Sequence, residues 1–327
     1  MSAQPAPDRS PALPGYADVL DAAARIRPWA RVTPVWQSPA LDALAGAELH
    51  FKCENLQRSG AFKFRGACNA VMGLPDAQAA RGVATQSSGN HGAAIALACR
   101  LRGIPASVVV PEGASELKLA NIRGEGARLL RCAPTMRARD AAVAALVAES
   151  GASLIHPFDD PAVIAGQGTA ALELLQARPS LDALVAPVGG GGLLSGTALA
   201  ARASGAAIEV WGAEPEAACD AHDSLAQGRL IDDRVPRTIC DGLRGHLSPR
   251  TYTLIARHAD GILLADEDAI RAALRLLWVH LKLVVEPSSA VALAVVLGHP
   301  QRFRDRRIGI ILSGGNLDPG DLPSLLA

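Results

Sequence analysis

Aromatic residues and an excess of charge of either sign are both missing from this chain. Phe, Trp and Tyr make up 3% of the sequence, so the stacking platforms that hold single-stranded nucleic acid are not expected. Lys and Arg number 32, as do Asp and Glu, and the net charge of +0 argues against a surface built for nucleic acid or an anionic membrane. Because 49% of the residues are hydrophobic, the chain is expected to fold around a sizeable core.

The sequence also has no CxxC pair and no long apolar run. Its six cysteines stand in ordinary apolar surroundings, which favours reduced core cysteines in a cytoplasmic protein over a zinc site or a disulfide framework. No stretch reaches the roughly 18 uninterrupted apolar residues of a membrane span. The Pro-rich start, up to Tyr16, lacks the apolar segment of a signal peptide, so we expect a loose arm there.

Short apolar segments alternate with amphipathic ones along most of the 327 residues. The apolar segments are rich in β-branched residues without strict alternation, a pattern typical of strands covered on both faces of a parallel sheet. This order predicts a doubly wound α/β architecture, and since no flexible linker is present, a second lobe would be inserted within the first. The predicted strands are 48–53, 83–86, 106–110, 128–132, 153–156, 183–187, 209–212 and 308–312, and the predicted helices include 139–149, 161–176 and 267–281.

A lysine, Lys63, stands between Phe62 and Phe64 in the segment SGAFKFRG. Apolar neighbours lower the pKa of a lysine amine and make it nucleophilic. A lysine at a helix start can also simply extend its charged end to solvent. From this segment alone the second interpretation is favoured, because desolvated lysines are rare.

A run of hydroxyl and amide side chains follows the predicted strand 83–86 and precedes a predicted helix over 93–101. It contains Ser87, Ser88, Asn90 and His91. Such groups, with backbone N–H groups at a helix N-terminus, can bind an anion. One Ser or Asn is enough to cap a helix, so this run offers more donors than a cap needs, although His91 by itself also fits a structural role.

Four consecutive glycines, 189–192, lie between another predicted strand and a helix. Their exposed N–H groups can surround a phosphate without any side chain, whereas a tight turn needs only one or two glycines. Thr197 stands where a Walker A loop requires lysine, and no register gives GxGxxG, so a dinucleotide is disfavoured.

A further hydroxyl, Ser313, follows the predicted strand 308–312 and could bond to a ring nitrogen, although a plain C-terminal turn fits locally as well. Taken together, the four segments offer a reactive amine, a phosphate-binding loop, an anion site and a hydroxyl for a heterocycle. A cofactor with an aldehyde, a phosphate and a pyridine ring needs these groups.

In order and combination, the motifs SGAFKFRGA, SSGNHG, HPFDDPAVIAGQGT, PVGGGGLLSG, EPSSA and LSGGN resemble those of the fold-type II pyridoxal-phosphate enzymes. They are most similar to the branch of serine racemases and serine/threonine dehydratases, which includes 3-hydroxyaspartate dehydratases. The resemblance runs from Tyr16 to Asn316. It implies a tryptophan-synthase-β-like fold with two doubly wound open-sheet lobes and pyridoxal phosphate between them: a large domain of residues 1–75 and 158–327, and a small inserted domain of residues 76–157.

The resemblance also implies roles for single residues. Lys63 would form the covalent linkage to the cofactor and later act as the base at the substrate Cα, while Phe62 would stack beside the pyridine ring. Ser313 would face the ring nitrogen, and a neutral hydroxyl there makes the ring a weaker electron sink, in agreement with α,β-elimination. The phosphate would be bound by Gly189, Gly190, Gly191, Gly192 and Leu193, the 3-hydroxyl by Asn90, and the substrate carboxylate by Ser87, Ser88, Asn90 and His91.

The leading expectation is an ammonia-lyase that removes water from L-serine or L-threonine and releases a 2-oxo acid and ammonia. Ser88, placed as an acid/base on the second face of the substrate, and Arg139, near the substrate hydroxyl, resemble the serine racemases, so serine or aspartate racemisation is an alternative. Phe158 resembles the dehydratases. Arg244, expected near the substrate mouth, would pair with a distal carboxylate, which makes 3-hydroxyaspartate a further candidate substrate.

A divalent-cation site and a dimer are implied in the same way. In the segment 214–220, Glu214 and Asp220 would provide carboxylate oxygens and Ala218 a backbone carbonyl to Mg²⁺, or to Ca²⁺ or Mn²⁺. A solvated acidic loop is the alternative interpretation. The family suggests a homodimer that acts on a small amino acid.

Overall fold

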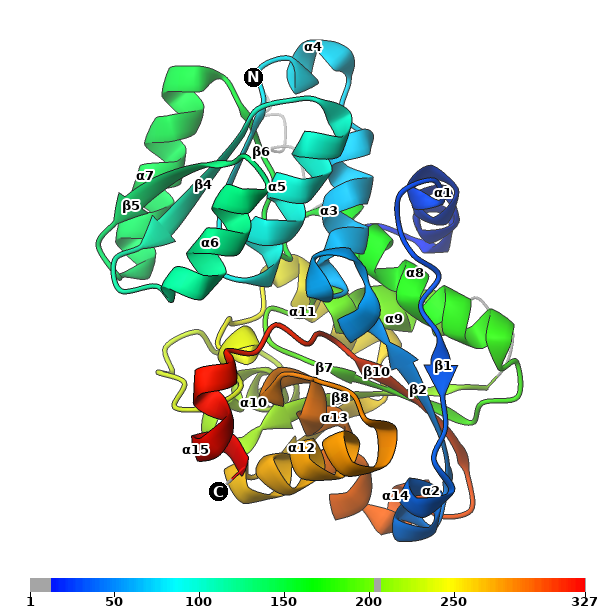
Figure 1. Ribbon diagram of the computed structural model, residues 1–327. Helices are drawn as coiled ribbons and strands as arrows, with labels where there is room; N and C mark the ends of the chain where they lie inside the picture. Colours follow the sequence, from blue (N-terminus) through cyan, green and yellow to red (C-terminus); the bar gives the residue numbers. More distant parts are fainter. Residues whose placement is uncertain (1–12, 203–206, 327) are drawn as a thin grey trace, which may run out of the picture.

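Two β-sheets, each with helices on both faces, form the protein (Figure 1). The computed structural model describes residues 13–202 and 207–326, so most of the expected N-terminal arm lies outside the described residues. The larger sheet has the strand order β1-β2-β10-β7-β8-β9, and all its neighbours are parallel except β1 and β2. Its strands are β1 (Val35–Trp36), β2 (Glu48–Cys53), β7 (Ala183–Pro187), β8 (Glu209–Pro215), β9 (Gly261–Ala265) and β10 (Arg307–Leu312).

The smaller sheet has the order β5-β4-β3-β6 and is parallel throughout. Alternate strand residues face opposite sides: Val83 and Val108 pack in the core under helix α5, whereas Ala84 and Val109 pack with residues of helix α7. This sheet and the helices around it are called the smaller part below. Its elements are β3 (Val83–Gln86), β4 (Ala106–Pro111), β5 (Arg128–Cys132), β6 (Ser153–Leu154), α4 (Asp76–Ala79), α5 (Asn90–Arg102), α6 (Glu116–Gly124) and α7 (Met136–Ser150).

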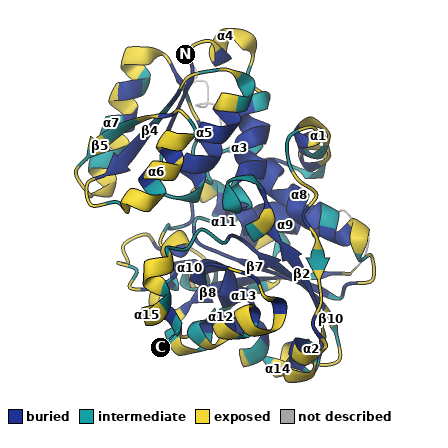
Figure 2. Ribbon diagram, viewed as in Figure 1, coloured by how far each residue is buried: buried dark blue, intermediate teal, exposed yellow. Residues whose placement is uncertain are grey.

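The helices around the larger sheet enclose its two main cores. Helix α13 is apolar on every side, as is typical of a buried helix. It lies with α12 on one face of the larger sheet, while α8 and α9 lie on the other face (Figures 1 and 2). The remaining elements are α1 (Tyr16–Ile26), α2 (Pro39–Ala45), η1 (Glu54–Leu56), η2 (Arg58–Gly60), α3 (Lys63–Met72), α8 (Pro161–Ala177), α9 (Gly192–Arg202), η3 (Glu216–Ala218), α10 (Asp220–Gln227), η4 (Asp241–Leu243), α11 (Pro249–His258), α12 (Glu267–Leu281), α13 (Pro287–Gly298), α14 (Pro300–Phe303), η5 (Pro319–Asp321) and α15 (Leu322–Leu326).

All eight predicted strands are present, and the α/β class with two open sheets is confirmed. The prediction missed β1 and β9, which lie at the two edges of the larger sheet. The four strands of the smaller sheet fall within residues 76–157, but the domain boundaries themselves stay a prediction. No helix among the described residues is long and apolar enough to cross a membrane. All six cysteines are free thiols; four of them are buried, whereas Cys132 and Cys219 are only partly buried.

The turns singled out in the sequence lie at the carboxyl ends of strands. The segment from Ser87 to His91, called the serine run below, follows β3. The glycines 189–192 follow β7, and Ser313 follows β10. Ligands of open α/β sheets bind at these ends. Helix α3 runs between the two sheets (Figure 1) and contacts both α5 of the smaller part and α8 beside the larger sheet. Lys63 is the first residue of this helix.

Candidate active site

The segment that carries Lys63 is fixed directly to the end of strand β10. The N–H of Phe62 donates to the carbonyl oxygen of Ser313 at 2.9 Å, and Ala61 forms an isolated antiparallel bridge with Gly314. Since α3 begins at Lys63, these contacts set both the start of the helix and the position of the lysine relative to Ser313.

The amine of Lys63 lies in a largely enclosed position. Its Nζ donates to the carbonyl oxygen of Pro157 at 3.0 Å and lies 5.1 Å from the centre of the Phe62 ring. Burial lowers the pKa of the amine to about 8, against the opposing effect of the Glu286 carboxylate. An amine with this pKa is neutral far more often at physiological pH than an exposed lysine, so it is suited to act as a nucleophile and base.

A buried ionic network holds the following turn of α3. Arg65 is fully buried and donates to both oxygens of Glu54, at 2.7 and 2.8 Å, and to both oxygens of Glu173, at 2.7 and 2.8 Å. Lys52 also donates to Glu173, at 2.6 Å. The network ties α3 to β2 and α8, two residues beyond Lys63.

Ser313 presents a buried hydroxyl at the end of β10. Its Oγ lies 3.0 Å from Oγ of Ser289, and its side chain is close to the carbonyl of Ser288. A hydroxyl at this position can bond to a neutral ring nitrogen. No acidic side chain occupies the position, as the sequence shows.

The glycine run forms a tightly packed loop before α9. A Cβ on Gly190 would lie 2.3 Å from the Phe158 ring, and Gly191 has φ +85°, a conformation that L side chains rarely adopt. The first N–H groups of α9, from Gly192 and Leu193, have no carbonyl partner within the helix. The loop therefore has no room for side chains at Gly190 and Gly191, and unpaired N–H groups stand at the start of α9, which fits a phosphate.

The serine run lies at the N-terminus of α5. Ser87 Oγ accepts the N–H of Gly89 at 3.2 Å, whereas Ser88 and Asn90 are half-buried. His91 is buried, and burial holds its pKa well below the usual range, so the ring is neutral. Its Nδ1 has no hydrogen-bond partner among the residues that the structure describes.

Glu286 also belongs to this group, although no sequence motif assigned it a role. It is buried at the start of α13 and accepts from Asn90 Nδ2 at 3.0 and 3.2 Å, while Asn316 donates to Asn90 Oδ1 at 2.8 Å. Burial, together with the nearby Asp241 carboxylate, raises the pKa of Glu286 to about 7. The only sequence signal was the EPSSA motif, which gives no role to its first residue.

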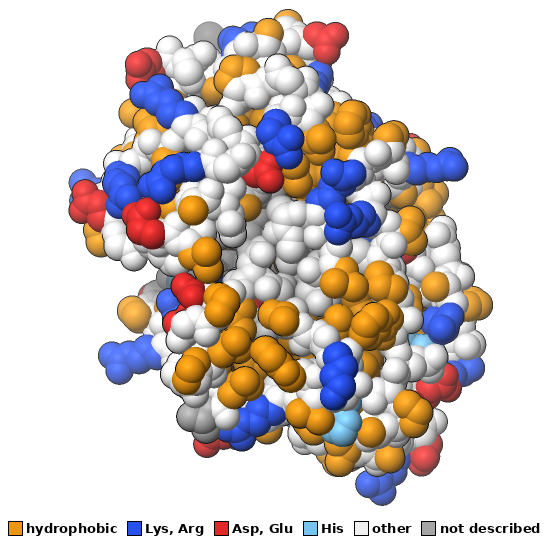
Figure 3. All heavy atoms as spheres, viewed as in Figure 1, with side chains coloured by type: hydrophobic (Ala, Val, Ile, Leu, Met, Phe, Trp, Pro, Cys, Tyr) orange, Lys and Arg blue, Asp and Glu red, His pale blue; other side chains and the backbone are white. Residues whose placement is uncertain are grey.

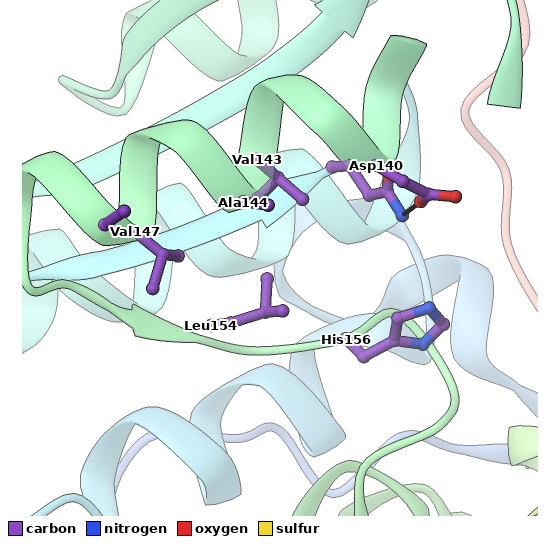
Figure 4. Close-up of a pocket in the computed structure, with 8 residues that line it drawn as sticks. Asp140, Val143, Ala144, Val147, Leu154 and His156 are labelled. Atoms are coloured by element: carbon purple, nitrogen blue, oxygen red, sulfur yellow. Dashed lines mark hydrogen bonds between the residues drawn. The ribbon is translucent and has the colours of Figure 1, made fainter. Parts of the chain in front are cut away.

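A cavity of about 460 Å³ adjoins the serine run in the smaller part (Figure 4). Val143, Ala144 and Val147 of α7 line one side and Leu154 of β6 the other, with His156 and Asp140 at one end. Gln86, directly before Ser87, donates to Asp140 at 2.8 Å and so links the cavity to the serine run. Burial lowers the pKa of His156, so its ring is neutral as well.

The two predicted substrate arginines differ in their surroundings. Arg139 lies on α7 beside Asp140, and its Nε is buried without a hydrogen-bond partner among the described residues. Arg244 is exposed, and its guanidinium donates to the carbonyl oxygen of Thr238 at 2.7 Å. Arg244 is thus bound to its own loop.

The predicted cation ligands lie at the end of β8 and the start of α10. Glu214 is fully buried and accepts the N–H groups of Ala221 and His222 at 3.0 and 2.8 Å, and Asp220 lies 3.2 Å from His246 Nδ1. Burial raises the pKa of both carboxyls, and their mutual repulsion adds to the shift of Glu214. A divalent cation would relieve this repulsion. No group of three or more His, Cys, Asp or Glu side chains in residues 13–202 and 207–326 could hold a metal, so waters would have to complete the shell.

Comparison with known proteins identifies the class to which this fold and site belong. The family model described as pyridoxal-phosphate dependent enzyme matches residues 26–314, and the chain belongs to that family. The fold is that of fold-type II members.

Individual relatives cover almost the whole chain. A β-hydroxyaspartate dehydratase of Paracoccus denitrificans is 47% identical over 95% of this chain and 99% of its own length. A serine racemase of Dictyostelium discoideum is 44% identical over 94% of this chain and 97% of its own length. A crystal structure of serine racemase from the same organism superimposes with a TM-score of 0.90 and covers 94% of this chain and 100% of that one. An L-threo-3-hydroxyaspartate ammonia-lyase of Saccharomyces cerevisiae is 44% identical over 94% of both chains.

Proposed function

We propose that the protein is a pyridoxal-phosphate-dependent ammonia-lyase that removes water from β-hydroxy amino acids, with 3-hydroxyaspartate as a substrate beside L-serine and L-threonine. The observation that carries the proposal is the enclosed Lys63 amine: the residue before it is bonded to the end of β10 at Ser313, and its charge acts on buried His91 of the serine run. Two of the relatives named above act, by their names, on hydroxyaspartate and belong to the dehydratase or ammonia-lyase class.

The residues present fit the cofactor. The N–H groups of the glycine loop and of α9 would bind the phosphate, and the loop packs so closely on Phe158 that a Cβ at Gly190 has no room. Ser313 would bond to the ring nitrogen, Phe62 would stack beside the ring, and Asn90 would bond to its 3-hydroxyl. When bound, pyridoxal phosphate supplies an aldehyde that holds the substrate amine and a conjugated ring that takes up the electron pair released at Cα.

This chain's own residues then move the protons. Neutral Lys63 takes the proton from Cα, the pair of electrons forms the Cα–Cβ double bond, and hydroxide leaves Cβ with a proton as water. Ser87, Ser88 and His91 would bind the carboxylate and keep the Cα–H bond facing the lysine. The enamine released from the site takes up water in solution and gives a 2-oxo acid and ammonia, so the atoms balance.

Turnover measurements test this assignment. We expect purified holoenzyme to convert L-threo- or L-erythro-3-hydroxyaspartate to a 2-oxo acid with a higher kcat/KM than L-serine or L-threonine. Release of the oxo acid is measured by coupling the reaction to a dehydrogenase that reduces the oxo acid. A protein that produces no oxo acid from any of the four compounds would contradict the ammonia-lyase assignment.

Serine or aspartate racemisation is a second candidate, and Ser88 favours it. The hydroxyl is half-buried in the serine run and would give the site a proton donor on the face opposite Lys63. A site with a base on one face and a donor on the other can return the proton to either side of Cα. The serine racemases among the relatives agree with this possibility.

The proposal also includes a bound divalent cation, a homodimer and a cytoplasmic location. Glu214, Asp220 and the Ala218 carbonyl would hold Mg²⁺, or Ca²⁺ or Mn²⁺, as a structural ion away from the reacting groups. The chain would form a homodimer, for which the apolar side chains gathered on the lower half of the face in Figure 3 provide a surface; Trp36, Leu56 and Val284 are among the exposed large apolar residues. The six free cysteines favour a cytoplasmic location.

A further inference from the structure

An ion pair connects the two parts of the molecule beside the candidate site. Nζ of Lys118, on helix α6 of the smaller part, contacts Oδ2 of Asp241, at the start of η4, across 123 residues of sequence. Neither the sequence motifs nor the roles assigned above use this pair.

Element η4, which begins at Asp241, packs against the glycine loop that would bind the cofactor phosphate. A Cβ on Gly189 would lie 2.9 Å from Cα of Leu243, so η4 packs directly on the glycine loop. The N–H of Gly242 donates to Oγ of Ser288 at 3.1 Å, two residues beyond Glu286. The charges of both Lys118 and Asp241 act on buried Glu286, which itself holds Asn90. The pair therefore lies near Asn90 and the serine run, to which the proposed function assigns the substrate carboxylate.

The ion pair is partly open to water. The side chains of Lys118 and Asp241 are 26% and 41% exposed, and an ion pair with this access to water stabilises a fold little. A lysine is a flexible point charge whose ammonium can follow a new carboxylate over a few ångströms. The other predicted partner of a distal carboxylate, Arg244, is bound to the Thr238 carbonyl instead.

We propose that Lys118 binds the distal carboxylate of a dicarboxylic substrate, which takes the place of the Asp241 carboxylate when the substrate enters. This inference rests on the proposed function and names the residue that separates 3-hydroxyaspartate from serine. Serine has no second carboxylate, so it leaves the Lys118–Asp241 pair intact and gains nothing from the ammonium. Arg139, on helix α7 at the other face of the smaller sheet, remains available to the β-hydroxyl.

Binding of two unreactive acids to the holoenzyme tests the proposal without turnover. Malate is 3-hydroxyaspartate without its amine, and 3-hydroxypropionate is serine without its amine, so neither can react. We expect calorimetry to show that Lys118→Gln weakens malate about 10- to 100-fold more than 3-hydroxypropionate, the range for loss of a charge-assisted hydrogen bond. Lys118→Arg should restore most of the preference. Arg123→Gln, on the same helix but paired with Glu116, is the matched control and should bind both acids like the wild type.

The Asp241→Asn variant distinguishes two roles of Lys118: binding of the substrate carboxylate, and a purely structural ion pair that holds the two parts of the molecule together. If Lys118 recognises the substrate, this variant keeps the malate preference or increases it, since the internal competitor is gone. If Asp241→Asn loses malate binding as strongly as Lys118→Gln does, the pair only holds the parts together and the proposal is wrong. Equal weakening of both acids in Lys118→Gln would also overturn it.

Kinetics distinguish a failure here from a failure of the proposed function. The kcat/KM ratio of 3-hydroxyaspartate over L-serine should fall in Lys118→Gln by a factor similar to that for malate. A wild type that prefers 3-hydroxyaspartate while Lys118→Gln keeps the preference would refute the role of Lys118 alone. A wild type that turns over L-serine but not 3-hydroxyaspartate would refute the proposed substrate and, with it, this inference.

Discussion

The backbone N–H of Phe62 donates to the carbonyl oxygen of Ser313 at 2.9 Å. These two residues are 251 positions apart in the sequence, yet this one bond fixes the backbone directly before Lys63 to the end of strand β10 at Ser313. The backbone positions from which the Lys63 amine and the Ser313 hydroxyl extend are therefore held at a fixed distance from each other. A cofactor that is held at both ends needs such a fixed distance.

Lys63→Ala should abolish both the covalent linkage and turnover. The purified wild type should be yellow, with an absorbance band near the visible edge that borohydride bleaches, and the variant should show neither the bleachable band nor oxo acid formation. Lys282→Asn is the matched control, because it removes another lysine at a left-handed position that Asn tolerates. Normal turnover in Lys63→Ala would contradict the assignment.

The lowered pKa of Lys63 predicts how cofactor uptake depends on pH. Only the neutral amine attacks an aldehyde, and its fraction rises as the pH rises through about 8. The rate at which apoprotein gains the visible band after addition of pyridoxal phosphate should therefore rise about tenfold per pH unit below 8 and level off above it. A rate that keeps rising up to pH 10 would show that the amine behaves like an exposed lysine.

Arg65→Met should destabilise the fold strongly. It leaves the fully buried Glu54 and the partly buried Glu173 without their main cationic partner. Removing one member of a buried ionic network typically costs about 3–5 kcal/mol, which urea unfolding can measure. The combination of Arg65→Met with Glu54→Gln and Glu173→Gln should recover part of the loss, and Arg123→Gln on the surface should have no measurable effect. Equal stabilities of Arg65→Met and wild type would mean that the network contributes little.

The fold could be predicted from local patterns because each buried parallel strand is a short β-branched run between turn residues. The prediction did not include strand β1, because two residues, Val35 and Trp36, carry no pattern. Strand β1 pairs antiparallel with β2, whereas the other strand pairs of the larger sheet in the described residues are parallel. Edge strand β9, Gly261–Ala265, follows helix α11 directly and was not separated from its surroundings.

The site was only partly predictable for a different reason. The serine run, the glycine loop and Lys63 each have a local composition that departs from that of an ordinary turn. Glu286 and the Lys118–Asp241 pair look like ordinary charged residues in the sequence. Their roles arise from contacts across 196 and 123 residues, which only the packing of the two sheets brings about.

Chelation should lower the melting temperature, and Mg²⁺, Ca²⁺ or Mn²⁺ should restore it. A cation present at about 100-fold its dissociation constant should raise the melting temperature by about 5 °C, because it binds only the folded state and relieves the repulsion between Glu214 and Asp220. Asp220→Asn should lose this response, whereas Glu216→Gln, in the same loop but exposed, should keep it. Melting curves that are identical with chelator and with excess cation would argue strongly against a site.

Ser88→Ala separates dehydration from racemisation. Elimination from the L-substrate needs only Lys63 as base, on one face of Cα. Racemisation also needs a donor on the other face, and dehydration of D-serine needs a base there. We therefore expect Ser88→Ala to abolish racemisation and D-serine dehydration, with a loss of about 10²–10⁴ in rate, while L-serine dehydration survives. Chiral chromatography and oxo acid assays report the two reactions separately.

Ser87→Ala is the matched control for this prediction, because Ser87 lies in the same run and its hydroxyl is already engaged by the N–H of Gly89. It should reduce turnover of both enantiomers in parallel, through the carboxylate site, without separating them. If Ser88→Ala removes L-dehydration as completely as Lys63→Ala does, elimination requires both faces and the assignment of one base is wrong. If the wild type does not racemise serine at all, the hydroxyl of Ser88 serves the carboxylate only, and the protein is a dehydratase with a single working face.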